Sequence, residues 1–410
     1  MKNFYTLIVA LFLMNGAMAQ WVPQNSGTTN ILNSVFFTDA YTGYVLGYNN
    51  IDSVSGIIKT NDAGTTWSPF TTLIAKELHC IYFTDANTGY VVGDSGTILK
   101  TVDAGTTWNT LSSGVTERLN SVYFTNSNIG YVCGQGVILK TSNAGTTWTV
   151  SYVNSGIWLN SIYFPDESIG YAVGYNINSD EDLVLKTINS GTTWTASSID
   201  TNSCGLFSVF FTNSDTGFAV GYGARIAKTI DAGTTWTITG ECTPFSYSLS
   251  SVYFTDDSTG YAVGGDLWAG AIIQKTVDCG ISWDWTFFEN SIYQIGVFNS
   301  VFFTGIDTGY VVGWNGGILK TTNGGVVGIN DHNQTINTLP IYPNPAKDNI
   351  TIETHTKGSL FIHNISGQQL LQQDITETAT TIDVSGLKSG VYFVRVTGER
   401  AVLVGKFIKQ

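Results

Sequence analysis

The chain has 410 residues, of which only 12% are charged, while 45 are glycine and 13% are aromatic. With 7 prolines, this composition excludes collagen-like and proline-rich disordered chains, and it suits many short β-strands joined by tight turns. The net charge of −13 disfavours nucleic acid as a partner, because binding to phosphates requires a basic patch.

The first residues predict an export signal. Lys2 supplies the positive charge, residues 4–14 form an apolar run, and Ala17-Met18-Ala19 is a small-x-small cleavage site. We expect residues 1–19 to be a signal peptide, so that the mature chain begins at Gln20. The apolar run is too short to span a bilayer, and no other segment approaches 18 apolar residues, so no transmembrane segment is predicted.

Two sequence words recur through residues 20–325. The first, Ser-Val-Phe/Tyr-Phe-Thr-Asp-x-x-Thr-Gly-Tyr-x-Val-Gly, occurs seven times at spacings of 40 to 49 residues, and a second word containing Leu-Lys-Thr follows each copy. This length is typical of a four-stranded propeller blade. In the third copy we expect strands over residues 119–124, 130–134, 137–141 and 146–150.

The final tryptophan of the second word occurs in six copies, although the first word occurs in seven. The missing tryptophan stands at the start of the mature chain, since Trp21 precedes Leu32 by 11 residues, as Trp67 precedes Leu78. A closed ring explains this permutation, whereas a solenoid does not require it. We therefore predict an all-β, seven-bladed β-propeller closed by the N-terminal strand, which joins the blade begun at Phe298.

The turn inside the second word follows the pattern Ser/Thr-x-Asp-x-Gly-x-Thr-Trp and resembles the Asp box of BNR-type propellers. We expect a carboxylate or amide to cap turn amides, the glycine to adopt a positive φ, and the tryptophan to pack between blades. With Gly-Tyr-x-Val-Gly and Leu-Lys-Thr added, about 300 residues are similar to the photosystem II stability/assembly-factor-like group, which implies a fold more than a function. We assign a structural role to Asp62, Asp103, Asn143, Asn189, Asp231 and Asp278.

Residues 339–410 lack both words, and their alternating runs with glycine turns predict a small Ig-like β-sandwich. The order Tyr342-Pro-Asn-Pro345, Ile362-His-Asn-Ile-Ser-Gly-Gln368 and Leu387-Lys-Ser-Gly-Val-Tyr-Phe-Val394 resembles the type A C-terminal sorting domain of the type IX (Por) secretion system. The resemblance implies a Bacteroidota-type cell, contact with the type IX machinery, and a secreted or outer cell-surface location. Residues 326–338 would be the linker in which cleavage falls.

The sequence offers little support for catalysis. A sialidase-like site needs an arginine cluster, but residues 20–330 contain only Arg118 and Arg225, and the single histidine there, His79, is interpreted as a satisfied or exposed residue. The lysines of Leu-Lys-Thr are interpreted as structural or solvated. We predict no catalytic residue, no metal site and no cofactor. The favoured function is a non-enzymatic binding or scaffold protein; a glycan-active hydrolase and an assembly factor for an envelope complex are the alternatives.

Variation in loop length points to one face of the propeller as the ligand site. The connections between second and third strands, and between fourth strands and the next repeat, differ most in length and emerge on the same face, where binding loops commonly lie. Acids and non-repeat tryptophans there suit a protein or glycan ligand, and the trio 180–182 suits Ca²⁺; solvated loops are the alternative. The candidate ligand-binding residues are Asp52, Trp158, Asp180, Glu181, Asp182, Asp266, Trp268, Trp285 and Trp314.

Five cysteines are present. Cys80, Cys133 and Cys279 occupy positions filled by small or aliphatic residues in sister repeats, so we interpret them as buried substitutes. Cys204 and Cys242 lie in successive loops outside the repeat words. Export permits a disulfide between these two residues, but their spacing does not decide it, and the odd count leaves at least one free thiol.

Overall fold

The computed structural model describes residues 21–200, 205–239, 247–266, 270–289, 296–325, 339, 341–354, 358–364, 369–398 and 402–410. These residues fall into two compact units, one before and one after residue 326. Both are built from antiparallel β-sheets, and the helical elements in the described part of the chain are two single 3₁₀ turns, η1 (Tyr222–Ala224) and η2 (Trp314–Gly316). No helix among these residues is long and apolar enough to cross a membrane.

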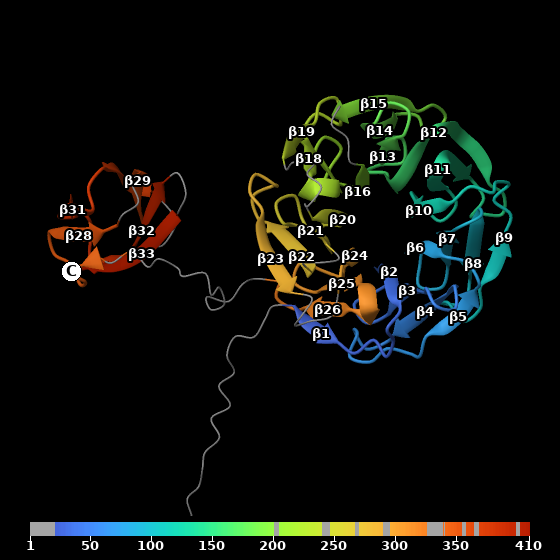
Figure 1. The fold of residues 1–410 in the computed structure, drawn as a ribbon, viewed down its shortest axis with the longest axis horizontal. Coiled ribbons are helices and arrows are strands. Elements are labelled where there is room, and N and C mark those ends of the chain that lie inside the picture. The colour runs from blue at the N-terminus through green and yellow to red at the C-terminus, as the bar shows by residue number, and fades with distance from the viewer. Residues whose placement is uncertain are drawn as a thin grey trace, which may run out of the picture. The chain divides into compact units, whose positions relative to one another are not determined.

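The first unit contains four sheets of four consecutive strands, arranged in a ring with the other sheets of the unit (Figure 1). Two of them are formed by β2 (Ile31–Phe37), β3 (Gly43–Asn49), β4 (Val54–Thr60) and β5 (Thr71–Ile74), and by β6 (Leu78–Phe83), β7 (Gly89–Gly93), β8 (Thr97–Thr101) and β9 (Asn109–Leu111). The others are formed by β16 (Leu206–Phe211), β17 (Gly217–Gly221), β18 (Ile226–Thr229) and β19 (Thr237–Thr239), and by β20 (Ser248–Phe254), β21 (Gly260–Asp266), β22 (Gly270–Thr276) and β23 (Asp284–Glu289).

A fifth sheet joins the two ends of the first unit. It consists of β24 (Phe298–Phe303), β25 (Gly309–Gly313), β26 (Ile318–Thr321) and the N-terminal strand β1 (Val22–Gln24), which pairs antiparallel with β26. Trp21 is 4% exposed and packs edge-on against Tyr261 and Phe303, with centroid distances of 6.2 and 5.9 Å. The chain start therefore supplies the outer strand of the last sheet, as the displaced tryptophan predicts.

The sixth sheet differs from expectation because it has six strands: β10 (Leu119–Phe124), β11 (Gly130–Thr141), β12 (Thr149–Tyr163), β13 (Gly170–Asn176), β14 (Glu181–Thr187) and β15 (Thr195–Asp200). β11 contains both strands predicted over 130–134 and 137–141, and the chain folds back between them at Gly136, which has a φ of +72°. The Lys140 ammonium accordingly lies 5.6 Å from the centre of the Tyr131 ring, and both side chains donate to the Ser190 carbonyl. The connection after residue 150, expected as a loop, belongs to β12. Its backbone finds ladder partners because Val153 lies opposite Val137 and Trp158 lies opposite Gln135.

The inner strands meet around the centre of the first unit (Figure 1). Contacts run from β2 through β6, β10, β12, β16, β20 and β24 back to β2. One aromatic side chain from each of these strands packs against the next, with ring centroids 5.0–5.5 Å apart in an uninterrupted circle. The members are Phe36, Tyr82, Tyr123, Tyr163, Phe210, Tyr253 and Phe302.

In six of the seven repeats a tyrosine hydroxyl and a lysine ammonium both donate to one carbonyl of the next repeat, and in the fifth repeat, which has Phe218, the lysine donates alone. The Tyr44 hydroxyl and the Lys59 ammonium both donate to the carbonyl oxygen of Ala104, at 2.9 and 3.0 Å. The ammonium also lies 5.0 Å from the centre of the Tyr44 ring. All seven repeat lysines donate in this way, and the last, Lys320, closes the circle on Ala63. The lysines are therefore structural.

The turn between the third and fourth strands is held by its own side chains. The Asp62 carboxylate accepts hydrogen bonds from the Thr66 amide (2.9 Å) and hydroxyl (2.6 Å) and from the Thr60 hydroxyl (2.8 Å). These bonds, led by that of the Thr66 hydroxyl, lower the pKa of Asp62 to about 2. Gly64 has a φ of +79°, and the Trp67 ring packs edge-on against Phe37. Similar bonds form at Asp103, Asn143, Asn189, Asp231 and Asp278.

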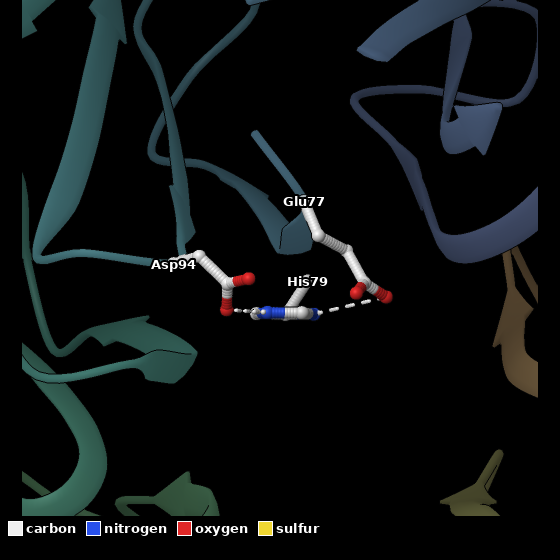
Figure 2. Close-up of side chains that lie close together, drawn as sticks. All are labelled: Glu77, His79 and Asp94. Atoms are coloured by element: carbon white, nitrogen blue, oxygen red, sulfur yellow. Dashed lines mark hydrogen bonds and ion pairs between the residues drawn. The ribbon is translucent and has the colours of Figure 1, made fainter. Parts of the chain in front are cut away.

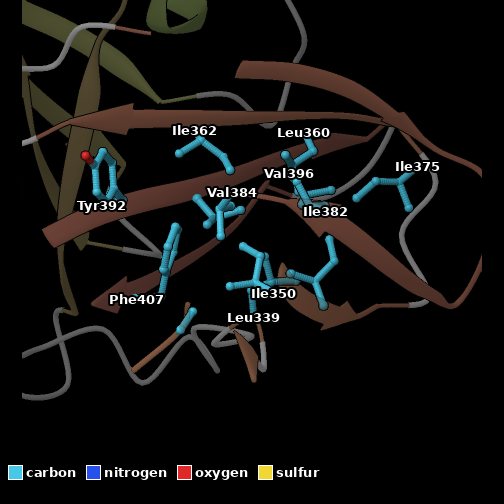
Figure 3. Close-up of a cluster of buried hydrophobic side chains, with 13 residues drawn as sticks. Leu339, Ile350, Leu360, Ile362, Ile375, Ile382, Val384, Tyr392, Val396 and Phe407 are labelled. Atoms are coloured by element: carbon cyan, nitrogen blue, oxygen red, sulfur yellow. The ribbon is translucent and has the colours of Figure 1, made fainter. Parts of the chain in front are cut away.

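The second unit consists of two antiparallel sheets around one core (Figure 3). One contains β27 (Ile341–Tyr342), β28 (Asn349–Glu353) and β31 (Ala379–Asp383). The other contains β29 (Gly358–Asn364), β30 (Gln369–Ile375), β32 (Gly390–Gly398) and β33 (Val402–Lys409). Alternate residues such as Ile350, Ile362 and Val394 are fully buried, so the strand alternation in the sequence reports the core correctly.

Candidate ligand-binding site

The first unit has a cavity of about 590 Å³ on the face where the inner strands begin and the second strands end. It opens over the stretch from β10 to β16. Its lining combines one guanidinium, three amides and four large apolar or aromatic side chains. The lining residues are Arg118, Asn120, Gln135, Trp158, Asn160, Tyr175, Ile177, Gly205 and Phe207.

Three neighbouring strands form one wall of the cavity. Gln135 of β11 lies opposite Trp158 of β12, and Trp158 lies opposite Tyr175 of β13. The Trp158 side chain is 49% exposed although its strand is continuous on both sides. A half-exposed indole in a cavity wall offers an apolar face for stacking and an N–H for hydrogen bonding. Trp158 is the one candidate from the sequence that lines this cavity.

The cavity is built from equivalent positions of successive repeats. In each repeat these are the two neighbours of the buried leucine (phenylalanine in the seventh repeat) that opens the inner-strand sequence word, and the residue after the glycine that ends the second strand. The third repeat contributes Arg118, Asn120 and Gln135, and the fourth contributes Trp158, Asn160 and Tyr175. The same positions in the second repeat hold Glu77, His79 and Asp94.

His79 lies between Asp94 and Glu77 in this second-repeat cluster (Figure 2), and its contact with Arg118 links the cluster to the cavity. Its Nε2 lies 2.9 Å from Asp94 Oδ1, and its Nδ1 lies 3.3 Å from Arg118 Nη2 and 3.8 Å from Glu77 Oε1. The Arg118 Nε donates to Asn120 Oδ1 at 3.0 Å and lies 3.6 Å from Asp94 Oδ1. The imidazole side chain is 9% exposed. Arg118 is therefore held by two neighbours at the edge of the cavity.

The charge state of His79 follows from these contacts. Burial, together with the positive charge of Arg118, lowers the pKa of His79, although Asp94 and Glu77 oppose the shift. The neutral ring then donates from Nε2 to Asp94 and accepts at Nδ1 from Arg118. Ligand atoms of Glu77, His79 and Asp94 lie within 4.8 Å of one another, which suits a metal ion. Both ring nitrogens are already engaged and a guanidinium adjoins them, so the arrangement favours an ion-pair network.

The acidic trio 180–182 does not converge on one point. Asp182 is fully buried; its Oδ2 accepts from Arg225 Nη1 at 2.9 Å and its Oδ1 accepts from the Gly205 amide at 2.8 Å. This corrects the expectation that Asp182 offers a ligand on the loop face, because its carboxylate is buried between the Arg225 guanidinium and the Gly205 amide. Asp180 accepts from the Tyr175 hydroxyl and Glu181 accepts from the Ser179 hydroxyl, so the three carboxylates have separate partners.

The other candidates lie elsewhere. Asp52 is exposed and capped by Asn49 in the turn between β3 and β4, Asp266 ends β21, and half-buried Trp314 lies in η2. These three belong to the loop face but to other repeats. Trp285 lies on the outer strand β23, opposite Gln274 and beside the turn that leads into the strand. This corrects its predicted place on the loop face, because Trp285 is the second residue of β23 and therefore lies near the opposite face, where the turn between β22 and β23 is found.

Some predictions fall outside the described residues: Trp268, the pairing of Cys204 with Cys242, the signal peptide and the linker. Cys80, Cys133 and Cys279 are free. Cys133 is buried, Cys80 is half-buried and Cys279 is exposed, so the interpretation as buried substitutes is wrong for Cys279. That residue has a φ of +59° in the turn before β23.

Two family descriptions match parts of the chain. Residues 340–410 match the secretion system C-terminal sorting domain, and residues 70–156 match the photosynthesis system II assembly factor YCF48. A comparison with curated proteins returns no match. The fold and the two matches define an all-β, propeller-like protein that carries a type IX sorting tail. The tail makes the chain a secreted or cell-surface protein.

Solved structures of similar fold agree with these matches. A structure described as YCF48 bound to D1 peptide has 18% identity and a TM-score of 0.59, covering 75% of this chain and 98% of that one. YCF48 from Cyanidioschyzon merolae has 16% identity and a TM-score of 0.57, covering 74% and 98%. PorZ, a surface component of the type IX secretion system of Porphyromonas gingivalis, has 11% identity and a TM-score of 0.52, and the likeness covers 90% of this chain but 58% of PorZ.

Proposed function

We propose that this secreted or cell-surface chain is a non-enzymatic binding protein that takes a peptide or glycan ligand in the cavity around Trp158. The observation that carries the proposal is the convergence of equivalent positions from successive repeats on one cavity. These positions do not pack in the core, so their residues differ from repeat to repeat. Variable surface positions on a rigid scaffold are where binding residues commonly lie. A peptide ligand is also in keeping with the description of YCF48 bound to D1 peptide.

The proposal includes a finer architecture. We propose that the six-stranded sheet counts as two blades merged by β12, so that the first unit is a seven-bladed Asp-box propeller over residues 20–325. The second unit, over residues 339–410, is an Ig-like sandwich that engages the type IX machinery, with residues 1–19 as signal peptide and 326–338 as linker. The circle of seven inner aromatic side chains supports this count.

Two arrays test the binding function. The purified protein is screened on a peptide array and a glycan array, and hits are measured again with Trp158→Ala and with Trp285→Ala. The second variant is a matched control, because Trp285 is 54% exposed against 49% for Trp158 and lies outside the cavity. We expect only Trp158→Ala to weaken ligand affinity, by at least tenfold, because truncation of an aromatic anchor costs about 2 kcal/mol or more of binding free energy.

Equal loss in both variants, or in neither, would sink the cavity as the binding site. A parallel screen on p-nitrophenyl glycosides addresses the hydrolase alternative. Robust turnover that Trp158→Ala abolishes would replace the binding function with a glycan-active enzyme.

An assembly factor for an envelope complex is the second candidate. Its specific support is the match of residues 70–156 to an assembly factor and the fold likeness to PorZ. A pull-down from cell envelopes distinguishes this candidate, because it requires a defined protein partner that Trp158→Ala no longer retains.

A further inference from the structure

The guanidinium of Arg118 is oriented at the cavity edge but not satisfied. Of its five N–H groups, the Nε–H bonds Asn120 Oδ1 and one Nη2–H bonds His79 Nδ1. The remaining three N–H groups have no acceptor among the described residues. The side chain is 49% exposed and lines the cavity. Such a fork matches the two oxygens of a carboxylate, and its orientation is fixed before any ligand arrives.

His79 and Asp94 hold this fork in place. The second repeat carries histidine where four sister repeats carry asparagine, at positions 33, 120, 160 and 299. In those repeats the asparagine amide donates to the carbonyl of the buried leucine in the inner strand of the next repeat. His79 instead turns one ring nitrogen to Asp94 and the other to Arg118. The histidine at this position therefore contacts Arg118, whereas the asparagine of the sister repeats bonds to the next inner strand.

Arg118 shares the cavity with an apolar surface. Trp158, Tyr175 and Phe207 line it together with the amides of Gln135 and Asn160. A ligand that pairs with the guanidinium therefore places its remaining atoms against aromatic surface. We propose that the cavity binds a monoanionic carboxylate attached to a group that packs on Trp158, with Arg118 as the specificity-determining residue and His79 as its positioning residue. This inference rests on the proposed binding function.

The charges behind Arg118 narrow the ligand class. Two carboxylates lie near the guanidinium and its imidazole partner. Asp94 Oδ1 is 3.6 Å from Arg118 Nε, and Glu77 Oε1 is 3.8 Å from His79 Nδ1. With neutral His79 the cluster carries one positive and two negative charges, and this net charge repels a dianion such as phosphate about twice as strongly as a monoanion. A single carboxylate that takes the free N–H groups directly is the anion that these contacts favour.

The test compares ligands that differ by one carboxylate. Short peptides with a free C-terminus are measured against the same peptides amidated, and oligosaccharides of glucuronic acid against their neutral glucose counterparts; the two arms distinguish a peptide from a glycan source. We expect the carboxylate form of one arm to bind about 10- to 100-fold more tightly, the range of a hydrogen bond to a charged group. Arg118→Met should abolish this preference while Trp158→Ala abolishes binding of both forms.

His79→Asn installs the residue of the sister repeats, so the fold has a precedent for it. We expect this variant to reduce the preference for the carboxylate form while the affinity for the amidated or neutral form stays unchanged, an effect that mere destabilisation would not produce. Binding that requires Trp158 but shows no carboxylate preference overturns the inference and leaves the binding function standing. Absence of any ligand sensitive to Trp158→Ala overturns the binding function itself.

Discussion

Phe218 is a natural gap in the circle of contacts that joins the repeats. In six repeats a tyrosine hydroxyl donates to the turn carbonyl of the next repeat, at 2.6–2.9 Å. The fifth repeat has Phe218 at this position, and its partner carbonyl, that of Cys279, accepts from the Lys228 ammonium at 2.6 Å. The substitution Phe218→Tyr therefore restores one hydrogen bond at a place where the chain already accommodates it six times.

The magnitude follows from the surroundings. The Phe218 ring stacks on Phe254 at 4.2 Å, within the 3.9–4.2 Å of the tyrosines on their own partners. No repacking is needed, so the gain is that of one neutral hydrogen bond, about 1 kcal/mol. Tyr171→Phe removes the equivalent bond to Ala232 and should cost about the same. For a unit of this size each change shifts the midpoint of thermal unfolding by about 2 °C, in opposite directions.

Thermal and urea unfolding of the two variants measure the effect, with Tyr41→Phe as control because Tyr41 is 66% exposed. We expect the control to match the wild type. The reasoning is refuted if Phe218→Tyr lowers stability, or if Tyr171→Phe costs no more than the control, because the hydroxyl would then contribute nothing to the joint between repeats.

Three further predictions concern the ring and its turns. Trp21→Ala should lower the free energy of unfolding by about 3–5 kcal/mol, because Trp21 is buried in the sheet that joins the ends; urea unfolding checks this, and a loss under 1 kcal/mol would contradict it. Hydrogen bonds led by that of Thr107 lower the pKa of Asp103 to about 2, so its contribution is present above about pH 4 and disappears as the pH falls through 2. The difference in stability between Asp103→Asn and the wild type at pH 7 should therefore shrink below about pH 4 and be mostly lost at pH 2; a difference of undiminished size at pH 2 would contradict it. Asp182→Asn leaves Arg225 without its buried carboxylate and should cost about 3–5 kcal/mol, measured by the same unfolding; a cost near zero would show that the pair is not needed.

Sequence periodicity predicts the strands of the first unit because each repeat carries the same local signals. The glycine of every Gly-Tyr pair is required by close packing; a Cβ at Gly43 would lie 2.5 Å from the Phe37 ring. The displaced Trp21 likewise predicts the pairing of β1 with β26. Merging of the third and fourth repeats through β12 was not predictable from these words, because it depends on a connection that lies outside them.

The candidate site was harder to predict than the fold. Trp158 is recognisable in the sequence as a tryptophan outside the repeat words, whereas neither Arg118 nor His79 indicates a site when it is considered alone. Glu77 and Asp94 join His79 only through the pairing of β6 with β7, which sets Leu78 opposite Gly93. A comparison of equivalent positions across repeats would have shown the signal, since the second repeat alone carries an acid, a histidine and an acid there. The burial of Asp182 was not predictable from its neighbours in the acidic trio, because its partner Arg225 lies 43 residues away in the sequence.

Photo-crosslinking in cell envelopes tests the central claim most directly. A photoreactive amino acid is placed at Ile177, which lines the cavity and is 46% exposed, or at Ile281, which is 81% exposed in the turn before β23. We expect a specific adduct from position 177 that disappears with Trp158→Ala, and none from position 281. An adduct of equal yield from position 281, or one from 177 that survives Trp158→Ala, would contradict the assignment of the cavity as the ligand site.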